Sequence, residues 1–529
     1  MKASDLLVEC LEREGVERVF GVPGEETEDL LFSIRDSDIT FVPVRHEQGA
    51  AFMANVHGRL TGEAGVCLGT LGPGSTNLMT GVADANLDKA PLVALTGQGG
   101  LERLHKESHQ ALDIVHLFEP ITKWNSQLTD PDTITESVRK AFKIAEYEKP
   151  GATHIEVPEN IAGMETDSVP MPNRKRVRPA YPDPNLIEEV GQVLQSNDRA
   201  LLIAGNGAVR TEAALQIRKL IDLANIPVAS TYMGKGAVSD DSPHSLMTLN
   251  SGDHQEASGA IESADVIITV GYDIAEHDPA DWNTGDRTVI VHIDSQPAEV
   301  YEAYNPDIEL VCDPAQALSE LKRYVKKHEI SYDSNWYRDL RQHIRKDVNT
   351  QYTAEDQFTV RKVLPVLRDV MAQDDVLISD VGSHKMDIAQ NFPCYEPNTC
   401  IISNGLASMG ISVPAGIAAD LATENDIVAA TGDGGFLMNA AEIETATRVG
   451  CSYTILLFNN DDYGLISEKQ QSHRGESYGT KLSNPDFVSL AESFGIDGYR
   501  PNGWTELENA LKRGLGSDSM TLVEIPIGQ

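Results

Sequence analysis

Short apolar runs alternate with helical patterns along this chain, and this alternation limits the possible folds more than any other sequence feature. It appears in three blocks, at residues 1–165, 184–330 and 358–529. A Pro-rich linker separates the first two blocks, and a polar, charged stretch at residues 326–357 leads into the third. Because strands that alternate with helices are joined by crossovers, the pattern predicts parallel sheets covered by helices. The predicted fold class is α/β, with three doubly wound parallel-sheet domains.

The apolar runs that we assign to strands are short and rich in Val, Ile, Leu and Phe. They fall at residues 18–20, 41–44, 66–68 and 92–95 in the first block, at 200–204, 266–270 and 288–293 in the second, and at 376–379, 427–430, 454–458 and 521–525 in the third. Continuous apolar runs of this length are typical of parallel strands that are buried on both faces.

Length and composition exclude several classes of protein. The 529 residues are 41% hydrophobic, so each block is long enough to bury its own core. No apolar run reaches the ~18 residues that a membrane-spanning helix needs, so no membrane partner is expected. The N-terminal residues lack the regions of a signal peptide, which predicts a cytoplasmic location. Six scattered cysteines without a Cys-x-x-Cys pair indicate neither a metal cluster nor a disulfide framework.

The chain is strongly acidic. Its formal charge is −38, and its acidic residues are spread along the chain and form no tail. Such a surface repels nucleic acid and anionic membranes, so neither is expected as a partner. A hydrated acidic surface is typical of proteins that work in high salt, where screening weakens self-repulsion. The charge therefore predicts a halophilic source.

The most specific motif lies in the third block and consists of two loops. The apolar run at 427–430 leads into Gly-Asp-Gly-Gly at 432–435, and a helical pattern follows at 439–449. The next apolar run, at 454–458, leads into Asn-Asn-Asp-Asp-Tyr-Gly at 459–464. Because ligands bind at the carboxyl ends of parallel strands, both loops are expected at one edge of the sheet.

The residues of these two loops fit a diphosphate and a hard cation. Gly432, Gly434 and Gly435 allow backbone N–H groups to approach a phosphate closely. Mg²⁺ prefers oxygen ligands and takes several of them from phosphate and water. Asp433, Asn460 and the carbonyl of Asp462 would supply the ligands from the protein. Two such loops, each after a strand and separated by one helix, are typical of thiamine diphosphate enzymes.

Further motifs make the chain resemble the acetolactate synthase group of thiamine-diphosphate-dependent enzymes over nearly its whole length. The first block matches the pyrimidine-binding domain of this family at residues 19–24, 44–50, 72–77 and 109–110. The third block matches the diphosphate-binding domain at residues 380–384 and 403–410. The resemblance implies a pyrimidine-binding domain at 1–165, a central α/β domain at 184–330 and a diphosphate- and Mg²⁺-binding domain at 358–529.

The resemblance also implies roles for individual residues. Glu47 is the carboxylate that activates the cofactor, by hydrogen bonding to the aminopyrimidine ring so that the C2 proton can be removed. Gln110 is a polar side chain that faces the reacting carbon, and Met409 is the apolar side chain that supports the bent cofactor. The remaining cofactor-binding residues that the resemblance implies are Gly24, Gly72, Asn77, Gly382, Ser383 and His384. In this family two chains enclose each cofactor, which implies a homodimer or homotetramer.

The chain departs from the biosynthetic members of the family at two places. Their Arg-Phe-Asp-Asp-Arg stretch, which belongs to the FAD site, is replaced here by residues 272–283, which resemble the flavin-free catabolic type. We therefore expect no FAD. Lys469 stands where the biosynthetic enzymes have a Trp that favours 2-oxobutyrate as acceptor. This difference favours condensation of two pyruvate molecules to 2-acetolactate.

Three other functions stay open at this stage. The chain could be another thiamine-diphosphate-dependent 2-oxo acid decarboxylase or carboligase. It could also be a catalytically silent paralogue, although that class is expected to lack Glu47 or Asp433, and both are present. An NAD- or FAD-linked oxidoreductase would need a fuller glycine fingerprint than Gly-Asn-Gly at 205–207.

The net charge predicts a salt dependence. Because 38 net negative charges repel one another in the compact state, we expect the melting temperature to rise between low and molar potassium chloride. Differential scanning calorimetry over that range measures the effect. A melting temperature that stays constant or falls would contradict the halophilic prediction.

Overall fold

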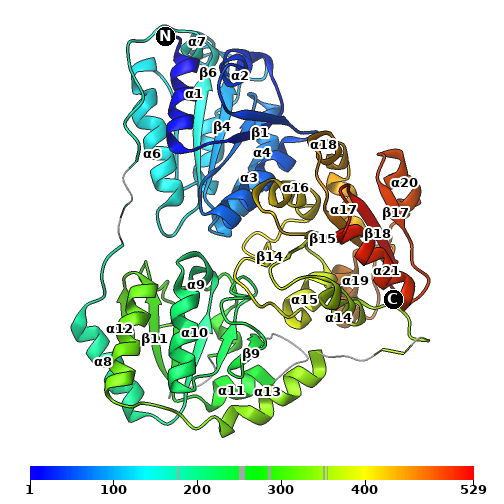
Figure 1. Cartoon of the computed structure of the whole chain (residues 1–529). Coiled ribbons are helices and arrows are strands. Elements are labelled where there is room, and N and C mark those ends of the chain that lie inside the picture. The colour runs from blue at the N-terminus through cyan, green and yellow to red at the C-terminus, as the bar shows by residue number, and fades with distance from the viewer. Residues whose placement is uncertain are drawn as a thin grey trace.

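The computed structural model describes residues 1–174, 177, 179–249, 256–283, 288–348, 352–353 and 355–528. Within these ranges the strands form three six-stranded sheets, and every strand pair is parallel. Figure 1 shows the three sheets as separate layers flanked by helices. The predicted fold class is confirmed. Each sheet lies inside one predicted block, and the block boundaries stay a prediction.

The first domain is built on a sheet with the strand order β2-β1-β3-β4-β6-β5. Its strands are β1 (Arg18–Gly21), β2 (Thr40–Pro43), β3 (Gly65–Gly69), β4 (Leu92–Gln98), β5 (Trp124–Gln127) and β6 (Ala152–Pro158). Its helices are α1 (Ala3–Glu14), α2 (Glu28–Arg35), α3 (Glu47–Thr61), α4 (Pro73–Leu87), α5 (Ile114–Phe118), α6 (Ile134–Glu146) and α7 (Glu159–Ala162). The order reverses direction between β1 and β3, where doubly wound sheets bind ligands.

The third domain repeats this strand order, as β14-β13-β15-β16-β18-β17. Its strands are β13 (Val376–Ser379), β14 (Cys400–Ile402), β15 (Ile427–Gly432), β16 (Thr454–Asn459), β17 (Asp497–Tyr499) and β18 (Thr521–Pro526). Its helices are α14 (Val360–Val370), α15 (Ser383–Asn391), α16 (Ser412–Ala422), α17 (Asp433–Asn439), α18 (Glu442–Val449), α19 (Gly464–Arg474), α20 (Phe487–Ser493) and α21 (Trp504–Leu515). The first and third domains therefore place corresponding loops at corresponding edges.

The middle domain has a different order, β12-β11-β10-β7-β8-β9, which is the order of dinucleotide-binding folds. Its strands are β7 (Ala200–Ala204), β8 (Val228–Ser230), β9 (Ser245–Thr248), β10 (Val266–Val270), β11 (Val289–Asp294) and β12 (Ile308–Val311). Its helices are α8 (Pro184–Ser196), α9 (Asn206–Arg210), α10 (Ala213–Ala224), α11 (Glu256–Ser263), α12 (Pro314–Lys327) and α13 (Asn335–Val348).

The first and third domains share one hydrophobic core, which includes Phe52 of α3 and Ile417 of α16. Buried polar contacts cross the same interface. Arg59 of α3 donates across it to the carbonyl of Ile402 at 2.8 Å, and pairs within its own domain with Asp88 at 3.3 Å. Glu442 of α18, which is 1% exposed, accepts from the backbone N of His46 at 3.0 Å. The shared core fixes the carboxyl edges of the two sheets relative to each other.

Two elements of local structure were not predicted. The helical pattern predicted over 439–449 corresponds to α18, and a further helix, α17, begins before it at Asp433. Positions 434 and 435, inside α17, are occupied by glycine because a side chain there would meet the Tyr463 ring or the Asp380 carboxyl group, respectively. Helix α13 lies within the stretch that we predicted to be a polar connector, and its Tyr337, Ile344 and Val348 pack into the middle domain. Among the described helices, none is long and apolar enough to cross a membrane.

Candidate functional site

The predicted site residues of the third domain follow four neighbouring strands at the carboxyl edge of its sheet. Met409 follows β14, and Gly382, Ser383 and His384 follow β13. The glycines Gly432, Gly434 and Gly435, together with Asp433, lie at the end of β15, and Asn460 and Asp462 follow β16. The four strands are adjacent in the order β14-β13-β15-β16. The structure therefore brings all these loops to one edge.

The two loops of the predicted magnesium site meet at the side chain of Asn484. Its Nδ2 donates to Asp433 Oδ2 at 2.6 Å, to Asn459 Oδ1 at 3.1 Å and to Asp461 Oδ1 at 2.9 Å. Three oxygens thus converge within reach of one polar hydrogen-bond donor. Asp433 is 2% exposed, and burial raises the pKa of its carboxyl group.

This oxygen-rich arrangement fits Mg²⁺ better than a softer metal ion. Among the described residues, no three His, Cys, Asp or Glu side chains gather in a way that could hold a metal. The predicted ligands are the Asp433 carboxylate, the Asn460 amide oxygen and the Asp462 carbonyl, whereas the oxygens that meet Asp433 at Asn484 belong to Asn459 and Asp461. Mg²⁺ completes a small set of protein oxygens with phosphate and water. Asn460 Oδ1 accepts from the backbone N of Asp462 at 3.2 Å, which holds the loop in a tight turn.

His384 lies between the two glycine-containing loops. Its ring would be 2.9 Å from a Cβ at Gly382 and 3.4 Å from a Cβ at Gly432, so both glycines leave room for the imidazole. The side chain is 3% exposed, and burial lowers its pKa to about 4, so the ring is neutral near pH 7. Its Nε2 is buried and has no hydrogen-bond partner in the described part of the chain. A buried polar atom without a partner can bind a ligand, and this nitrogen donates to a diphosphate when it carries the ring proton.

The predicted residues of the first domain lie at the corresponding edge of its own sheet. Gly24 follows β1, Glu47 follows β2, Gly72 and Asn77 follow β3, and Gln110 follows β4. Glu47 is the first residue of α3 and is 7% exposed. Asn77 Nδ2 donates to Glu47 Oε2 at 2.9 Å, so two predicted site residues bind each other directly.

Gly72 and Gln110 also contact each other. Gly72 has φ +53°, and a Cβ at this position would lie 2.6 Å from the carbonyl oxygen of Gln110. Gln110 itself has φ +56° and is exposed. An open hollow of about 440 Å³ lies beside Gly24, between Pro23 and Phe32. The first domain thus places Gly24, Glu47 and Gln110 at one edge of its sheet, and of these three residues only Gly24 lines the hollow.

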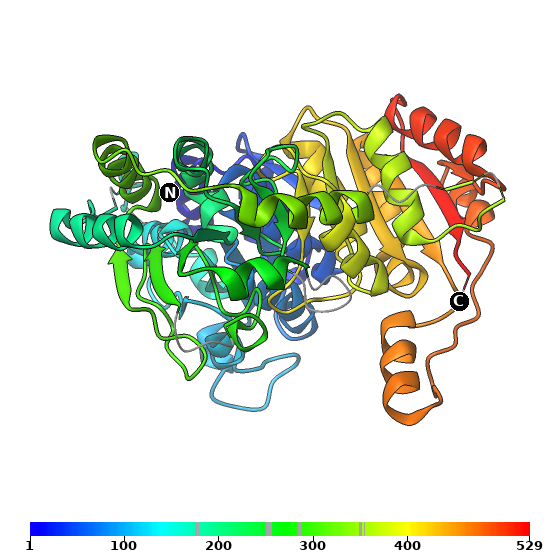
Figure 2. The same cartoon turned by 90° about the horizontal axis from the view of Figure 1, so that it is seen from below.

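The predicted site residues of the first domain and those of the third domain are not joined directly within one chain. Among the described residues, the side-chain hydrogen bonds of Glu47 and of Asp433 stay within their own domains. In Figure 2, helix α19 stands away from the rest of the third domain, and it contains no buried residue. The surface of α19, next to the metal-site loop, is therefore left open.

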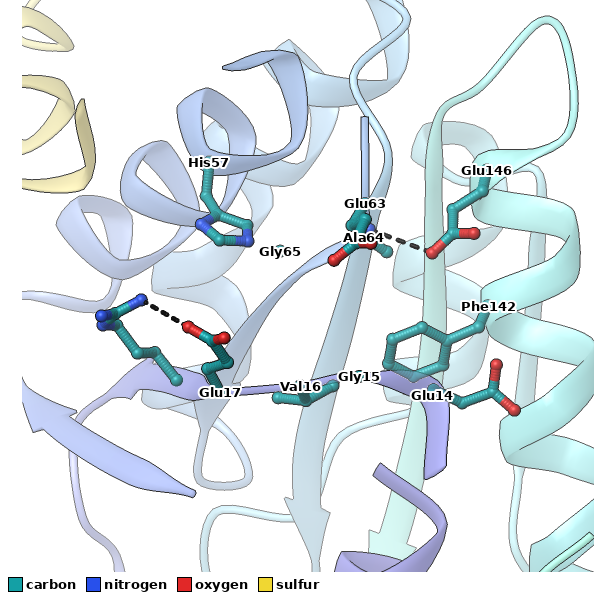
Figure 3. A pocket seen from close by; sticks show the side chains of 11 residues that line it. Glu14, Gly15, Val16, Glu17, His57, Glu63, Ala64, Gly65, Phe142 and Glu146 are labelled. Atoms are coloured by element: carbon teal, nitrogen blue, oxygen red, sulfur yellow. Dashed lines mark hydrogen bonds and ion pairs between the residues drawn. The ribbon is translucent and has the colours of Figure 1, made fainter. Parts of the chain in front are cut away.

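A smaller pocket lies at the opposite edge of the first sheet, among the amino ends of β1 and β3 (Figure 3). It offers about 10 Å³, which is room for about one water molecule. Glu14, Glu17, Glu63, Glu146 and His57 surround it. Its size and its position at the amino ends of the strands separate it from the candidate site.

Sequence reasoning missed several residues that shape the site. Asn484 joins the two metal-site loops from 51 positions beyond Asp433. Asp380 belongs to a recognised motif, but the sequence does not show that its carboxylate accepts from the backbone N of Gly410 at 2.8 Å. Asp84 lies on α4 and Asp88 is its C-cap residue. Their spacing of four residues predicts only that they lie on the same helix face, and does not predict their partners.

Family models match all three domains. Residues 1–117 match the N-terminal TPP binding domain of thiamine pyrophosphate enzymes, residues 187–321 match their central domain, and residues 380–525 match their C-terminal TPP binding domain. Thiamine pyrophosphate (TPP) and thiamine diphosphate are the same compound.

Curated relatives cover almost the whole chain. Acetolactate synthase of Bacillus subtilis is 32% identical over 99% of this chain and 93% of its own length. The probable acetolactate synthase large subunit of Methanocaldococcus jannaschii is 32% identical over 100% of this chain and 92% of its own. The catabolic acetolactate synthase of Raoultella terrigena is 32% identical over 99% of this chain and 94% of its own length.

Asp433→Ala is expected to abolish retention of thiamine diphosphate and Mg²⁺. The substitution removes the carboxylate that supplies one of the converging oxygens, and metal and diphosphate are expected to bind together. Isothermal titration calorimetry with both ligands measures the loss. Asp426→Ala, an exposed acid at the amino end of the same strand, serves as the control and should leave binding intact. Wild-type affinity in Asp433→Ala would refute the metal assignment.

Proposed function

The chain belongs to the thiamine pyrophosphate enzyme family, and from this membership we propose that it is a thiamine-diphosphate- and Mg²⁺-dependent acetolactate synthase. It would remove carbon dioxide from one pyruvate and join the remaining two-carbon unit to a second pyruvate, giving 2-acetolactate. The observation that carries the proposal is the similarity to acetolactate synthases along nearly the whole chain, with Glu47 and Asp433 both present.

Glu47 is the proposed acid–base residue. When bound, thiamine diphosphate supplies the electron sink that allows a 2-oxo acid to lose carbon dioxide. The Glu47 carboxylate is buried at the start of α3, and Asn77 fixes one of its two oxygens. The other oxygen is left to hold and release a proton at the aminopyrimidine ring. Gln110, on an exposed loop, is proposed to face the substrate.

The third domain is proposed to hold the other end of the cofactor. Asp433, Asn460 and the carbonyl of Asp462 would bind Mg²⁺, and the Nε2 atom of the His384 side chain is available to the diphosphate. Gly382, Ser383 and the glycines at 432, 434 and 435 would let the diphosphate approach the backbone. Half-buried Met409 would support the cofactor from the neighbouring loop.

Two chains are proposed to complete each site, in a homodimer or homotetramer. Glu47 and Asp433 make their side-chain hydrogen bonds in separate domains of one chain. Helix α19 follows the metal-site loop and buries none of its residues. Because an isolated helix of 11 residues is marginally stable in water, a surface of a second chain beside α19 would stabilise it.

A flavin is not part of the proposed enzyme. In the middle domain the strand order reverses between β7 and β10, where dinucleotides bind in folds of this order. The Glu276 carboxylate already accepts there from the backbone N of Asn206 at 3.0 and 3.1 Å, and from Thr231 Oγ1. Burial raises the pKa of Glu276 to about 8. An incoming phosphate group would have to displace this buried carboxyl group.

Product analysis tests the proposed reaction. Pure protein incubated with pyruvate, thiamine diphosphate and Mg²⁺ is expected to form 2-acetolactate, identified by NMR or mass spectrometry. Acetaldehyde as the main product would instead indicate a simple decarboxylase of the same family. No consumption of pyruvate would require another 2-oxo acid as substrate.

Glu47→Gln is expected to leave the fold and cofactor binding intact and to slow deprotonation at C2 of the cofactor. The glutamine side chain keeps the size but cannot exchange a proton, and such assistance is worth about 10²–10⁴-fold. Deuterium exchange at C2, followed by NMR, measures the rate directly. Glu63→Gln, an exposed position in the same domain, is the control. An exchange rate equal to wild type in Glu47→Gln would remove the proposed role.

The purified protein is expected to be colourless, and its activity with pyruvate should not depend on added FAD. Decarboxylation and carbon–carbon bond formation transfer no hydride, and Glu276 occupies the reversal point of the middle sheet. Absorbance spectroscopy and assays with and without FAD test this expectation. A yellow protein that loses activity when the flavin is removed would contradict it.

A further inference from the structure

The loop at residues 403–411 connects β14 to α16 and carries Met409, the proposed support of the cofactor. Its backbone is unusual, since Ala407 has φ +55° and Gly410 has φ +87°. A non-glycine residue rarely adopts the left-handed region, so this shape needs contacts from outside the loop. The position of Met409 therefore depends on what holds the loop.

The third domain holds the end of the loop. The backbone N of Gly410 donates to Asp380 Oδ1 at 2.8 Å, and Asn439 Nδ2 donates to the carbonyl of Gly410 at 2.8 Å. Ser412 Oγ also donates to Asp380 Oδ2, at 3.0 Å. These contacts fix the residue that follows Met409.

The first domain holds the other side of the loop through Asp84. This residue of α4 is fully buried. Its Oδ1 accepts from Ser403 Oγ at 2.7 Å and from the backbone N of Ser408 at 3.4 Å, and its Oδ2 accepts from Asn55 Nδ2 at 2.9 Å. Ser408 directly precedes Met409, so the contacts of Asp84 reach the residue next to the cofactor support.

We propose that Asp84 is a positioning residue, which holds Met409 in place from the neighbouring domain through Ser403 and Ser408. This inference rests on the proposed function only in taking Met409 as the support of the cofactor. Asp88, four residues further on, contacts the start of the loop instead. It accepts from the backbone N of Gly405 at 2.6 Å and pairs with Arg59. Asp84 is therefore the acid of this pair whose contact lies next to Met409.

The surroundings of Asp84 suggest which variants to make. Burial and the nearby Asp88 raise the pKa of Asp84 to about 7, against the opposing effects of Ser403 and Arg59. Since burial disfavours the charged form, a neutral amide is expected to replace the carboxyl group. Asn55 faces Asp84 with its Nδ2, and its Oδ1 is buried without a partner in the described residues. When the Asn55 amide turns over, this oxygen accepts from the introduced amide.

The first test measures the loop without cofactor, by hydrogen–deuterium exchange of the peptide that covers residues 403–411. Asp84→Ala is expected to speed its exchange about tenfold, which corresponds to the loss of one buried hydrogen bond. Asp84→Asn should exchange like wild type. Asp375→Ala is the matched control, because this 6% exposed acid accepts backbone N–H groups at the amino edge of the third sheet. Unchanged exchange in Asp84→Ala would overturn the proposal.

The second test uses the holoenzyme and asks whether Asp84 acts through Met409. Asp84→Ala is expected to slow C2 deuterium exchange of bound thiamine diphosphate about 10- to 100-fold, as a displacement of about 1 Å can do. In the Met409→Ala background the same substitution should cause no further slowing, because coupled residues are not additive. Fully additive effects would show a general structural role and refute the proposal.

Two features keep the result interpretable. If Asp84→Ala does not fold, Ser403→Ala removes the same hydrogen bond from the side of the loop and gives the same two readouts. Exchange at C2 needs no pyruvate, so a different substrate would leave this test intact. Conversely, a negative result in the loop test would not contradict the proposed formation of 2-acetolactate.

Discussion

The candidate site depends on the parallel arrangement of the strands. In a parallel sheet the loops that follow the strands all emerge at one edge, and here the first and third sheets share one strand order. The predicted residues therefore follow the corresponding four strands in both domains, β2-β1-β3-β4 and β14-β13-β15-β16. The Glu47 carboxylate, proposed for proton transfer, lies at one edge, and the proposed ligands of the cation and the diphosphate lie at the other.

These edges need a rigid support, because the polar groups that they carry do not pack into a core of their own. The support is the hydrophobic core that α3 and α16 share, together with the buried pair of Arg59 and Asp88. Arg59 also donates to the carbonyl of Ile402, and Asp88 accepts from the backbone N of Gly405, so both members of the pair bind the third domain across this junction. The loop that carries Met409 crosses the same junction. The geometry of the site and the packing of the domains are thus physically coupled.

The middle domain shows that sheets of one fold class can carry different side chains at the edge where ligands bind. Its strand order is that of dinucleotide-binding sheets, and Gly205 and Gly207 still allow a close turn after β7. Glu276 lies beside this turn, and its carboxyl group is bound by the backbone and by Thr231. A fold class therefore does not define a ligand, and the side chains at the end of each strand decide what can bind.

The sequence alone determined the α/β class, the positions of most strands and the loops that carry the candidate residues, because apolar runs and glycine-rich turns are local signals. It did not determine that α17 begins at Asp433, because Gly434 and Gly435 predict a turn by themselves. Their actual role is to leave room for Tyr463 and Asp380, which come from other segments. The roles of Asn484, Asp84 and Glu276 were equally hidden, because their partners lie 51, 319 and 70 positions away. Only the tertiary structure decided these contacts, since a buried polar side chain is defined by the groups that satisfy it, and those groups come from distant segments.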